Sequence, residues 1–312
     1  MARIPLKNTE PESARDIEKY ARRLLRAADV GDRLPTPKED ILKCSELVLS
    51  GGIDLDDYAE SYLRKKSRAL ISGLGKILGI LDVRDKTVII SPDVPESRKP
   101  FVTFHEVSHD MLPWQVDTYK YFADSNEALR PDIEWQYEKE ANFGSAKLLF
   151  QCDRFQKEAK EYELSLRTGR KLKQDYGTSY HSTFWNYVET NSNSCFLLVM
   201  RQCNYTVMHD GSMQLPYQLL YPVASAKFID EFGGMALPEK FYSDHPFIQP
   251  LDDPTVDSSE VYEGEVSLKN RNGEKVDTRF EAWTNTYNLF VLIWKKPKFQ
   301  LRKKRVLFSP AI

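Results

Sequence analysis

The chain is organised around one segment, FVTFHEVSHDML, at residues 101–112. This segment contains the pattern HExxH, formed by His105, Glu106 and His109. Residues four apart lie on the same face of a helix, so the two imidazoles can bind one metal ion. Glu106 lies about 100° round the helix, beside the ion, where it can take a proton from water and return it to a leaving amine.

An HExxH pattern can also arise by chance on an exposed helix, where it would have no function. Two observations favour a metal site here. The chain has only five histidines, and two of them fall in this pattern. In addition, Phe101 and Leu112 continue the face of the two histidines, after an entrance at Pro100, and would hold the helix against a core.

A catalytic zinc site needs a third protein ligand and one open position. The candidates lie in EWQYEKEANFGSAKLLF, at residues 134–150, which is helical by pattern. Glu138 shares a helix face with Ala141 and Ser145, which are both small, so its side chain is expected to point inward. Helical spacing therefore favours Glu138 as the third ligand.

Glu140 is the alternative ligand, and the choice between the two glutamates stays open at this point. Glu140 shares a face with Gly144 and Lys147, so the simpler interpretation is a surface carboxylate that pairs with the lysine. Glu134 lies one turn before Glu138 and is interpreted as an acid at the start of the helix, where the helix dipole favours negative charge.

Together, these segments resemble the ImmA/IrrE family of metallopeptidases. Members of that family have a hairpin, a helix with the pattern R-x-x-F-x-x-x-H-E-x-x-H, and a later helix that contains E-x-x-A-N and a pair of leucines. The resemblance covers roughly residues 75–200. The matching positions are Arg98, Phe101, His105, Glu106 and His109 in the first motif, and Glu138, Ala141, Asn142, Leu148 and Leu149 in the second.

The resemblance implies zinc-dependent cleavage of a specific protein, often a helix-turn-helix transcriptional repressor, and hence a role in transcription regulation. It also implies that His105, His109 and Glu138 bind the zinc ion and that Glu106 is the catalytic acid and base. The sequence itself shows no clear helix-turn-helix segment.

Three positions depart from the family pattern. Ser108 stands where a glycine is common, Gly144 where an alanine is usual, and Gln151 where a proline often follows the leucine pair. None of the three changes removes a ligand. We therefore still expect activity, with altered packing behind the site.

The chain as a whole is expected to be an α+β protein in three parts. Residues 1–75 form a helical N-terminal region in this interpretation. Residues 76–190 form a zincin-like metallopeptidase core with a short sheet at residues 77–91. Residues 191–312 form a β-rich C-terminal domain, because runs such as SCFLLVMRQ and NLFVLIW are strand-like and are separated by turn signals. That domain is a candidate for a regulatory or sensory role.

Composition restricts the location and the partners. The formal net charge is −2, so no global field favours nucleic acid or an anionic membrane. The first residues contain no apolar signal region, and no run approaches the roughly 18 apolar residues of a membrane span. The four cysteines are scattered without a CxxC pair, which predicts reduced thiols buried as small apolar side chains. We therefore expect a cytoplasmic protein with no membrane partner.

The leading hypothesis is a zinc-dependent endopeptidase that cleaves a protein substrate held as an added strand on the edge of the short sheet. The alternative is a regulatory or sensor protein that retains a zinc-binding fold and acts by binding. A third hypothesis, nucleic-acid binding through the basic tail at residues 295–305, is disfavoured, because such runs more often protect a strand edge or face water.

The remaining histidines and two tyrosines complete the candidate residues. His181, His209 and His245 are isolated in the sequence, so they are interpreted as surface or core side chains. Tyr119 and Tyr121 lie between the two motif helices and are candidate donors to an oxyanion. The sequence does not identify the substrate, its cleavage site, the activating signal or the oligomeric state.

Overall fold

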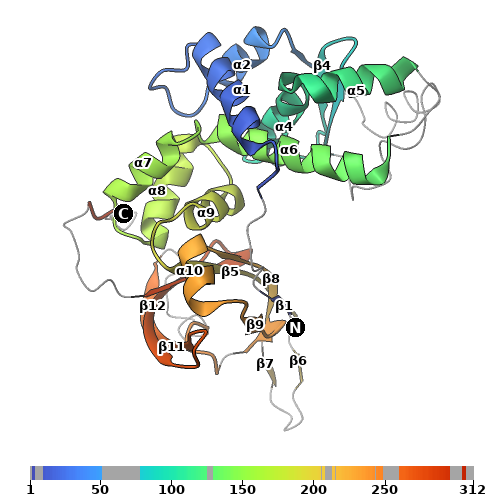
Figure 1. The fold of residues 1–312 in the computed structure, drawn as a ribbon. Coiled ribbons are helices and arrows are strands. Elements are labelled where there is room, and N and C mark those ends of the chain that lie inside the picture. Colours follow the sequence, from blue (N-terminus) through green and yellow to red (C-terminus); the bar gives the residue numbers. More distant parts are fainter. Residues whose placement is uncertain are drawn as a thin grey trace. The chain divides into compact units, whose positions relative to one another are not determined.

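The chain folds into two compact units in a computed structural model (Figure 1). We call Thr9–Phe155 with Lys173–Ser179 the helical unit, and Met1–Asn8, Gln156–Leu172 and Tyr180–Ile312 the sheet unit. The three-part division at residues 75 and 190 stays a prediction. The structure describes residues 2–3, 10–50, 78–124, 129–204, 206–207, 213–214, 216–242, 244–248, 260–295 and 304–306.

The helical unit combines several helices with a small sheet. The predicted helical character of residues 1–75 is seen in its first two helices, whereas residues 51–77 lie outside the described part of the chain. The elements that lie in this unit are α1 (Ala14–Ala27), α2 (Lys38–Cys44), β2 (Val48–Ser50), β3 (Gly79–Asp82), β4 (Thr87–Ile90), α4 (Lys99–Met111), α5 (Pro113–Asp124) and α6 (Pro131–Leu149).

The small sheet has the strand order β2-β4-β3. The hairpin of β3 and β4 confirms the two short strands predicted at residues 77–91, and β2 joins β4 as a parallel neighbour. Because β4 is central, its Val88 and Ile89 side chains are fully buried. Among the described residues, β3 pairs with β4 alone and so forms one edge of the sheet.

Helix α4 packs against both this sheet and α6. Pro100 lies in the first turn of α4, where a backbone N–H has no partner within the helix and its absence costs nothing. The buried apolar side chains of α4 are Val102, Phe104 and Val107. The helix ends at Met111, before Leu112 in extended conformation and Pro113, since the residue before a proline avoids the helical region. Helix α1 packs on α6 as well, so α6 is covered by two helices.

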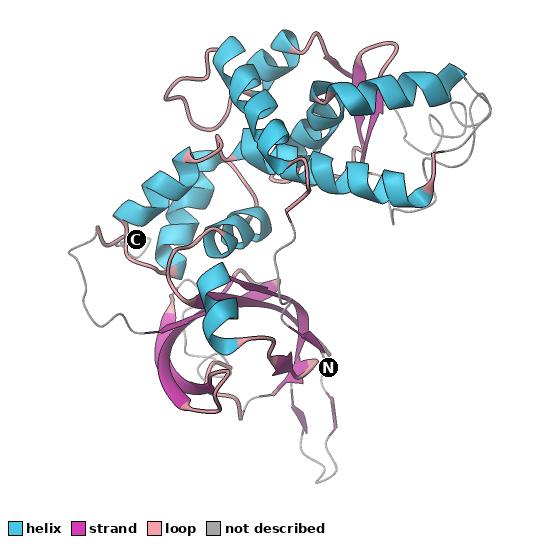
Figure 2. Cartoon of the chain, in the orientation of Figure 1, coloured by secondary structure: helices cyan, strands magenta, loops and turns pink. Residues whose placement is uncertain are grey.

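The sheet unit is built on one antiparallel sheet of six strands in the order β10-β8-β5-β13-β12-β11, shown in magenta in Figure 2. Helix α7 (Arg154–Glu161) begins in the helical unit, and helix α8 (Leu166–Tyr176) ends there. The unit's other elements are β1 (Ala2–Arg3), α9 (Tyr180–Glu189), β5 (Cys195–Gln202), β6 (Thr206–Val207), β7 (Met213–Gln214), β8 (Tyr217–Ala224), α10 (Ala226–Phe232), β9 (Ala236–Leu237), β10 (Lys240–Phe241), β11 (Tyr262–Lys269), β12 (Lys275–Thr284) and β13 (Asn288–Lys295).

Strands β5 and β13 are buried on both faces, which explains their nearly continuous apolar sequences. On one face, Phe196 of β5 packs against Phe228 of α10, with ring centroids 4.5 Å apart. Alternate residues point to the opposite face, where Phe290 of β13 packs against Phe184 of α9. The prediction of an α+β chain with a β-rich C-terminal half is therefore confirmed.

Strand β8, which contains Pro222, was not among the strands predicted from the sequence. The structure accommodates the proline at a position where β8 has β5 on one side and no β10 partner on the other. A proline is tolerated there because the hydrogen bonds of the sheet do not use the backbone N–H at this position. None of the helices that the structure describes is both long and apolar enough to cross a membrane.

Candidate metal centre

Helices α4 and α6 bring the three predicted metal ligands together. The two imidazole Nε2 atoms of His105 and His109 lie 3.2 Å apart. Glu138 of α6 lies against both of them, with Oε2 at 3.1 Å from His105 Nε2 and Oε1 at 3.4 Å from His109 Nε2. Within the described part of the chain, this is the one group of three His, Cys, Asp or Glu side chains whose ligand atoms all lie within 4.8 Å of one another.

These separations fit a tetrahedral metal ion. Ligand atoms at 2.0–2.2 Å from a tetrahedral ion are about 3.3 Å from each other by geometry. The two imidazole nitrogens, 3.2 Å apart, are close to that value, and each of them faces a different oxygen of Glu138, at 3.1 Å for His105 and 3.4 Å for His109. Two imidazole nitrogens and one carboxylate form a donor set suited to zinc and to related divalent metals. The group can therefore hold a metal ion and leave one position open.

The charge of Glu138 is stabilised by the two histidines. Burial would raise the pKa of its carboxyl, but hydrogen bonds and charge interactions with His105 and His109 hold that pKa well below its usual range. The prediction that Glu138 points inward agrees with its side-chain exposure of 23%. Glu134 lies in the first turn of α6, as predicted for a helix-start acid.

Glu106 is buried on α4 next to the ligands. Burial raises the pKa of its carboxyl, the two histidines act in the opposite direction, and the net shift is upward. A raised pKa is the direction that a carboxylate acting as general base requires. Strand β3 approaches this carboxylate closely, because a Cβ atom placed on Gly79 would lie 2.8 Å from Glu106 Oε1. Gly79 is a site residue that the sequence analysis missed.

The interpretation of Glu140 as a solvated surface carboxylate is wrong. Only 1% of Glu140 is exposed, because α1 and α5 cover that face of α6. Its Oε1 accepts hydrogen bonds from Ser13 Oγ at 2.6 Å and Gln136 Nε2 at 3.3 Å. Its Oε2 accepts from Trp114 Nε1 at 2.8 Å and Gln115 Nε2 at 2.7 Å. Glu140 therefore lies outside the ligand group.

Each ligand histidine has an amide partner at its other ring nitrogen. His105 Nδ1 lies 3.2 Å from Asn142 Oδ1, and His109 Nδ1 lies 2.7 Å from Gln115 Oε1. Such partners orient metal-ligating imidazoles in proteins. Asn142 belongs to the motif noted in the sequence. Gln115 was missed, because no sequence motif pointed to it. It lies in the first turn of α5, a helix that the sequence analysis did not predict.

Tyr119, one of the two candidate oxyanion donors, contacts His109. Tyr119 Oη lies 3.5 Å from His109 Nδ1, the ring nitrogen opposite the one that faces Glu138. Its ring packs edge-on against His109 and Tyr137, and burial raises the pKa of its hydroxyl. Tyr121 is exposed. Tyr119 is therefore a packing partner of His109.

The departures from the family pattern are accommodated in the structure. A Cβ atom on Gly144 would lie 2.7 Å from Ser108 Oγ, so the larger residue on α4 faces the smaller one on α6. Gln151 has a φ of 52°, which a proline cannot adopt, and its Nε2 donates to the carbonyl oxygen of Arg33 at 2.8 Å. Gly144 and Ser108 therefore face each other, and Gln151 holds a backbone conformation that excludes proline.

Among the described residues, the other predicted features do not belong to the ligand group. His181 contacts Tyr221 and Asn288, and His245 packs on Phe247, which agrees with structural roles. His209 and most of the basic tail lie outside the described residues. Of that tail, Lys304 and Arg305 pair with Glu161 and Glu163. The four cysteines are free, and only Cys152 and Cys195 are buried, so the expectation of burial is wrong for Cys44 and Cys203.

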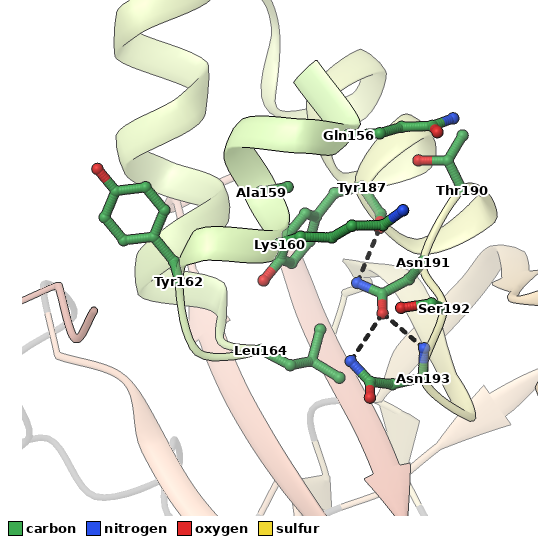
Figure 3. A pocket seen from close by; sticks show the side chains of 10 residues that line it. All are labelled: Gln156, Ala159, Lys160, Tyr162, Leu164, Tyr187, Thr190, Asn191, Ser192 and Asn193. Atoms are coloured by element: carbon green, nitrogen blue, oxygen red, sulfur yellow. Dashed lines mark hydrogen bonds between the residues drawn. The ribbon is translucent and has the colours of Figure 1, made fainter. Parts of the chain in front are cut away.

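A small pocket lies in the sheet unit (Figure 3). Its polar side chains largely satisfy one another, since Asn191 Oδ1 accepts from both the backbone N–H and the side-chain amide of Asn193. The Asn191 amide in turn donates to the carbonyl oxygen of Tyr187. Lys160 is the one ordinarily charged side chain among the lining residues. The pocket therefore lacks the convergent charged groups found at the metal centre.

Comparisons with known proteins leave the activity open. No family model matches the sequence, and no curated protein matches it. A solved structure described as a Mycobacterium tuberculosis transcriptional regulator is similar to this chain, with a TM-score of 0.49 and 10% sequence identity over 90% of this chain and 76% of that one. A likeness of this degree gives no information on activity.

Proposed function

We propose that this chain is a zinc-dependent endopeptidase with a zincin-like core. The observation that carries the proposal is the group of His105, His109 and Glu138, in which the two Nε2 atoms lie 3.2 Å apart and each faces one oxygen of the same carboxylate. Glu106 supports it, because a buried carboxylate directly beside a metal site is the arrangement that peptide hydrolysis uses. The ImmA/IrrE resemblance adds the expectation that the substrate is a specific protein, such as a helix-turn-helix repressor.

In this proposal, the metal-binding side chains and Glu106 have separate roles in peptide hydrolysis. His105, His109 and Glu138 would hold the ion. A zinc ion, when bound, supplies Lewis acidity that polarises a carbonyl and acidifies water. Glu106 accepts a proton from the attacking water and delivers it to the leaving amine. Its raised pKa favours both steps, because the carboxyl can take up the proton and later release it.

The edge that β3 forms among the described strands is our candidate for holding an extended substrate. The backbone N–H of Ser91 donates to the carbonyl of Leu78, and bonded pairs alternate along an antiparallel ladder. The N–H and C=O groups of Gly79 and Leu81 therefore point away from β4. An added strand could pair with them, directly beside the strand that covers Glu106.

The test of this edge has to leave the central strand β4 intact. Val88 lies in the central strand, pairs with both Leu49 and Leu81, and is fully buried, so a proline there would disrupt the sheet. We choose Leu81→Pro, which removes one outward N–H without touching the ladder to β4. The control is Leu81→Ala, which keeps that N–H. Substrate docking on this edge predicts loss of cleavage in the proline variant alone, with zinc retained in both.

The proteolytic proposal is tested with Glu106→Gln, which leaves all three ligands in place. New protein N-termini are compared by mass spectrometry in cells that produce equal amounts of wild type and variant. Fragments present only with the wild type identify the substrate and support proteolysis. A regulatory effect that persists in Glu106→Gln, without such fragments, would contradict it and favour a protein that acts by binding.

A further inference from the structure

A chain of hydrogen bonds runs from the ligand His109 to the start of α1. His109 Nδ1 contacts Gln115 Oε1 at 2.7 Å, and Gln115 Nε2 donates to Glu140 Oε2 at 2.7 Å. Glu140 then accepts from Ser13, the residue at the N-cap position of α1. We call His109, Gln115 and Glu140 the relay. Every member of the relay is buried, so water does not compete for these bonds.

The relay determines which way the Gln115 amide points. Its Nε2 faces two acceptors, Glu140 Oε2 at 2.7 Å and the carbonyl oxygen of Tyr137 at 3.4 Å. Turning the amide over would place Gln115 Oε1 against both oxygens, with no hydrogen to bridge either contact. The carboxylate of Glu140 therefore keeps Oε1 of Gln115 directed at His109.

This orientation determines the tautomer of His109. A glutamine Oε1 has no hydrogen to donate, so the short contact with Nδ1 requires the proton to be on the histidine. In the neutral ring, Nε2 is then unprotonated, with its lone pair directed at the ligand group. That is the form of imidazole that binds a metal through Nε2.

We propose that Gln115 and Glu140 are positioning residues that hold His109 in its metal-binding tautomer. The inference rests on the metal site of the proposed function, and it does not depend on proteolysis. Trp114 and Ser13 hold the carboxylate of Glu140 in turn. The Ser13 hydroxyl makes no capping bond to α1, because it is directed at Glu140. The start of α1 is therefore part of the support of the metal site.

The test measures zinc affinity by chelator competition on the full-length chain. Gln115→Met keeps most of the side-chain volume and removes both amide bonds, and Glu140→Gln removes the anion that orients the amide. We expect each change to weaken zinc binding about 10- to 100-fold, the usual effect of losing such a partner. The matched control is Gln136→Met, because Gln136 donates to the other oxygen of Glu140 and has no link to His109. Its zinc affinity should stay close to that of the wild type.

A second measurement follows the tautomer itself. Nitrogen-15 spectra of the metal-free protein at about pH 9 should show His109 protonated on Nδ1 in the wild type and in Gln136→Met. In Gln115→Met, we expect a mixture of the two neutral tautomers. A merely structural role of Gln115 would not produce that change.

The outcomes separate this inference from the proposed function. Wild-type affinity in folded Gln115→Met or Glu140→Gln, or an unchanged tautomer, would overturn the relay and leave the zinc site standing. A wild type that binds no divalent metal would overturn the site and the relay together. If Gln115→Met does not fold, the isosteric Glu140→Gln variant still decides between these outcomes.

Discussion

The helical unit and the sheet unit bury different kinds of side chain. In the helical unit, Glu106, His109, Gln115 and Glu140 are all buried on three neighbouring helices. In the sheet unit, β5 and β13 bury almost unbroken apolar runs, and Glu281 is the one buried carboxylate among its described residues. Among the described residues, the buried carboxylates and imidazoles therefore lie mostly in the helical unit.

Glu281 shows what a buried carboxylate does away from a reactive site. Its Oε2 accepts hydrogen bonds from the backbone N–H of Leu166 at 2.5 Å and from Ser165 Oγ at 2.9 Å, which joins β12 to the start of α8. Burial raises the pKa of Glu281 to about 7, although both hydrogen bonds lower it. Glu140 supports a ligand, whereas Glu281 supports a helix terminus, so burial alone does not indicate function.

The largest effect is expected from Glu138→Ala, which removes one of the three ligands. Zinc affinity should fall by more than about 100-fold, because losing a direct ligand costs more than losing a hydrogen-bond partner of a ligand. In the wild type, zinc should slow hydrogen exchange in the helical unit and leave the sheet unit unchanged. Glu134→Ala, one turn earlier on α6, is the control and should retain zinc. Equal zinc content in Glu138→Ala and wild type would refute the ligand assignment.

Gly79→Ala should impair the chemistry without removing the metal. The added Cβ would lie 2.8 Å from Glu106 Oε1 and 2.8 Å from Val102 Cγ1, so the carboxylate must move. A displacement of about 1 Å at a catalytic group costs on the order of 100-fold in rate. The measurement is the rate at which Glu106-dependent fragments form, with Leu81→Ala on the same strand as control. Normal cleavage by Gly79→Ala would show that the close approach has no catalytic importance.

Glu281→Gln should change the pH dependence of the sheet unit. The carboxyl has a pKa of about 7 when folded and an ordinary value of 4.5, so the folded state holds its proton more tightly. The free energy of unfolding of the wild type should therefore fall as pH rises from about 4.5 to 7, by about 3 kcal/mol in total. Urea unfolding at about pH 5 and pH 8 measures this loss. The glutamine variant should lack it, and an identical pH profile would contradict the assignment.

Gly144→Ala tests the packing between α4 and α6. The new methyl group would meet Ser108 Oγ at 2.7 Å, and overpacking of this kind costs about 1–3 kcal/mol in the free energy of unfolding. Adding Ser108→Gly should recover much of that loss, because it removes the opposing side chain. Denaturant unfolding of the two single variants and the double variant gives the coupling. Strictly additive effects would mean that the two positions do not compensate.

The sequence was informative where a local pattern controls the geometry. The spacing of His105 and His109 places both imidazoles on one helix face in any α-helix, so the HExxH group needed no knowledge of the fold. Glu138 was favoured for the same reason, from its small neighbours on α6. The alternating and apolar runs of β5, β11, β12 and β13 likewise predicted strands.

Only the tertiary structure decided the residues that support this group. Glu140 looked solvated because its helix face carries Gly144 and Lys147, and the sequence could not show that α1 and α5 cover that face. Gln115 and Gly79 depend on contacts with residues 6 and 27 positions away, respectively. Helix periodicity is a property of neighbouring residues, so the sequence alone identified His105 and His109 as candidate ligands and favoured Glu138 over Glu140. Burial and outer hydrogen bonds depend on which distant segments meet, so they follow only from the packed fold.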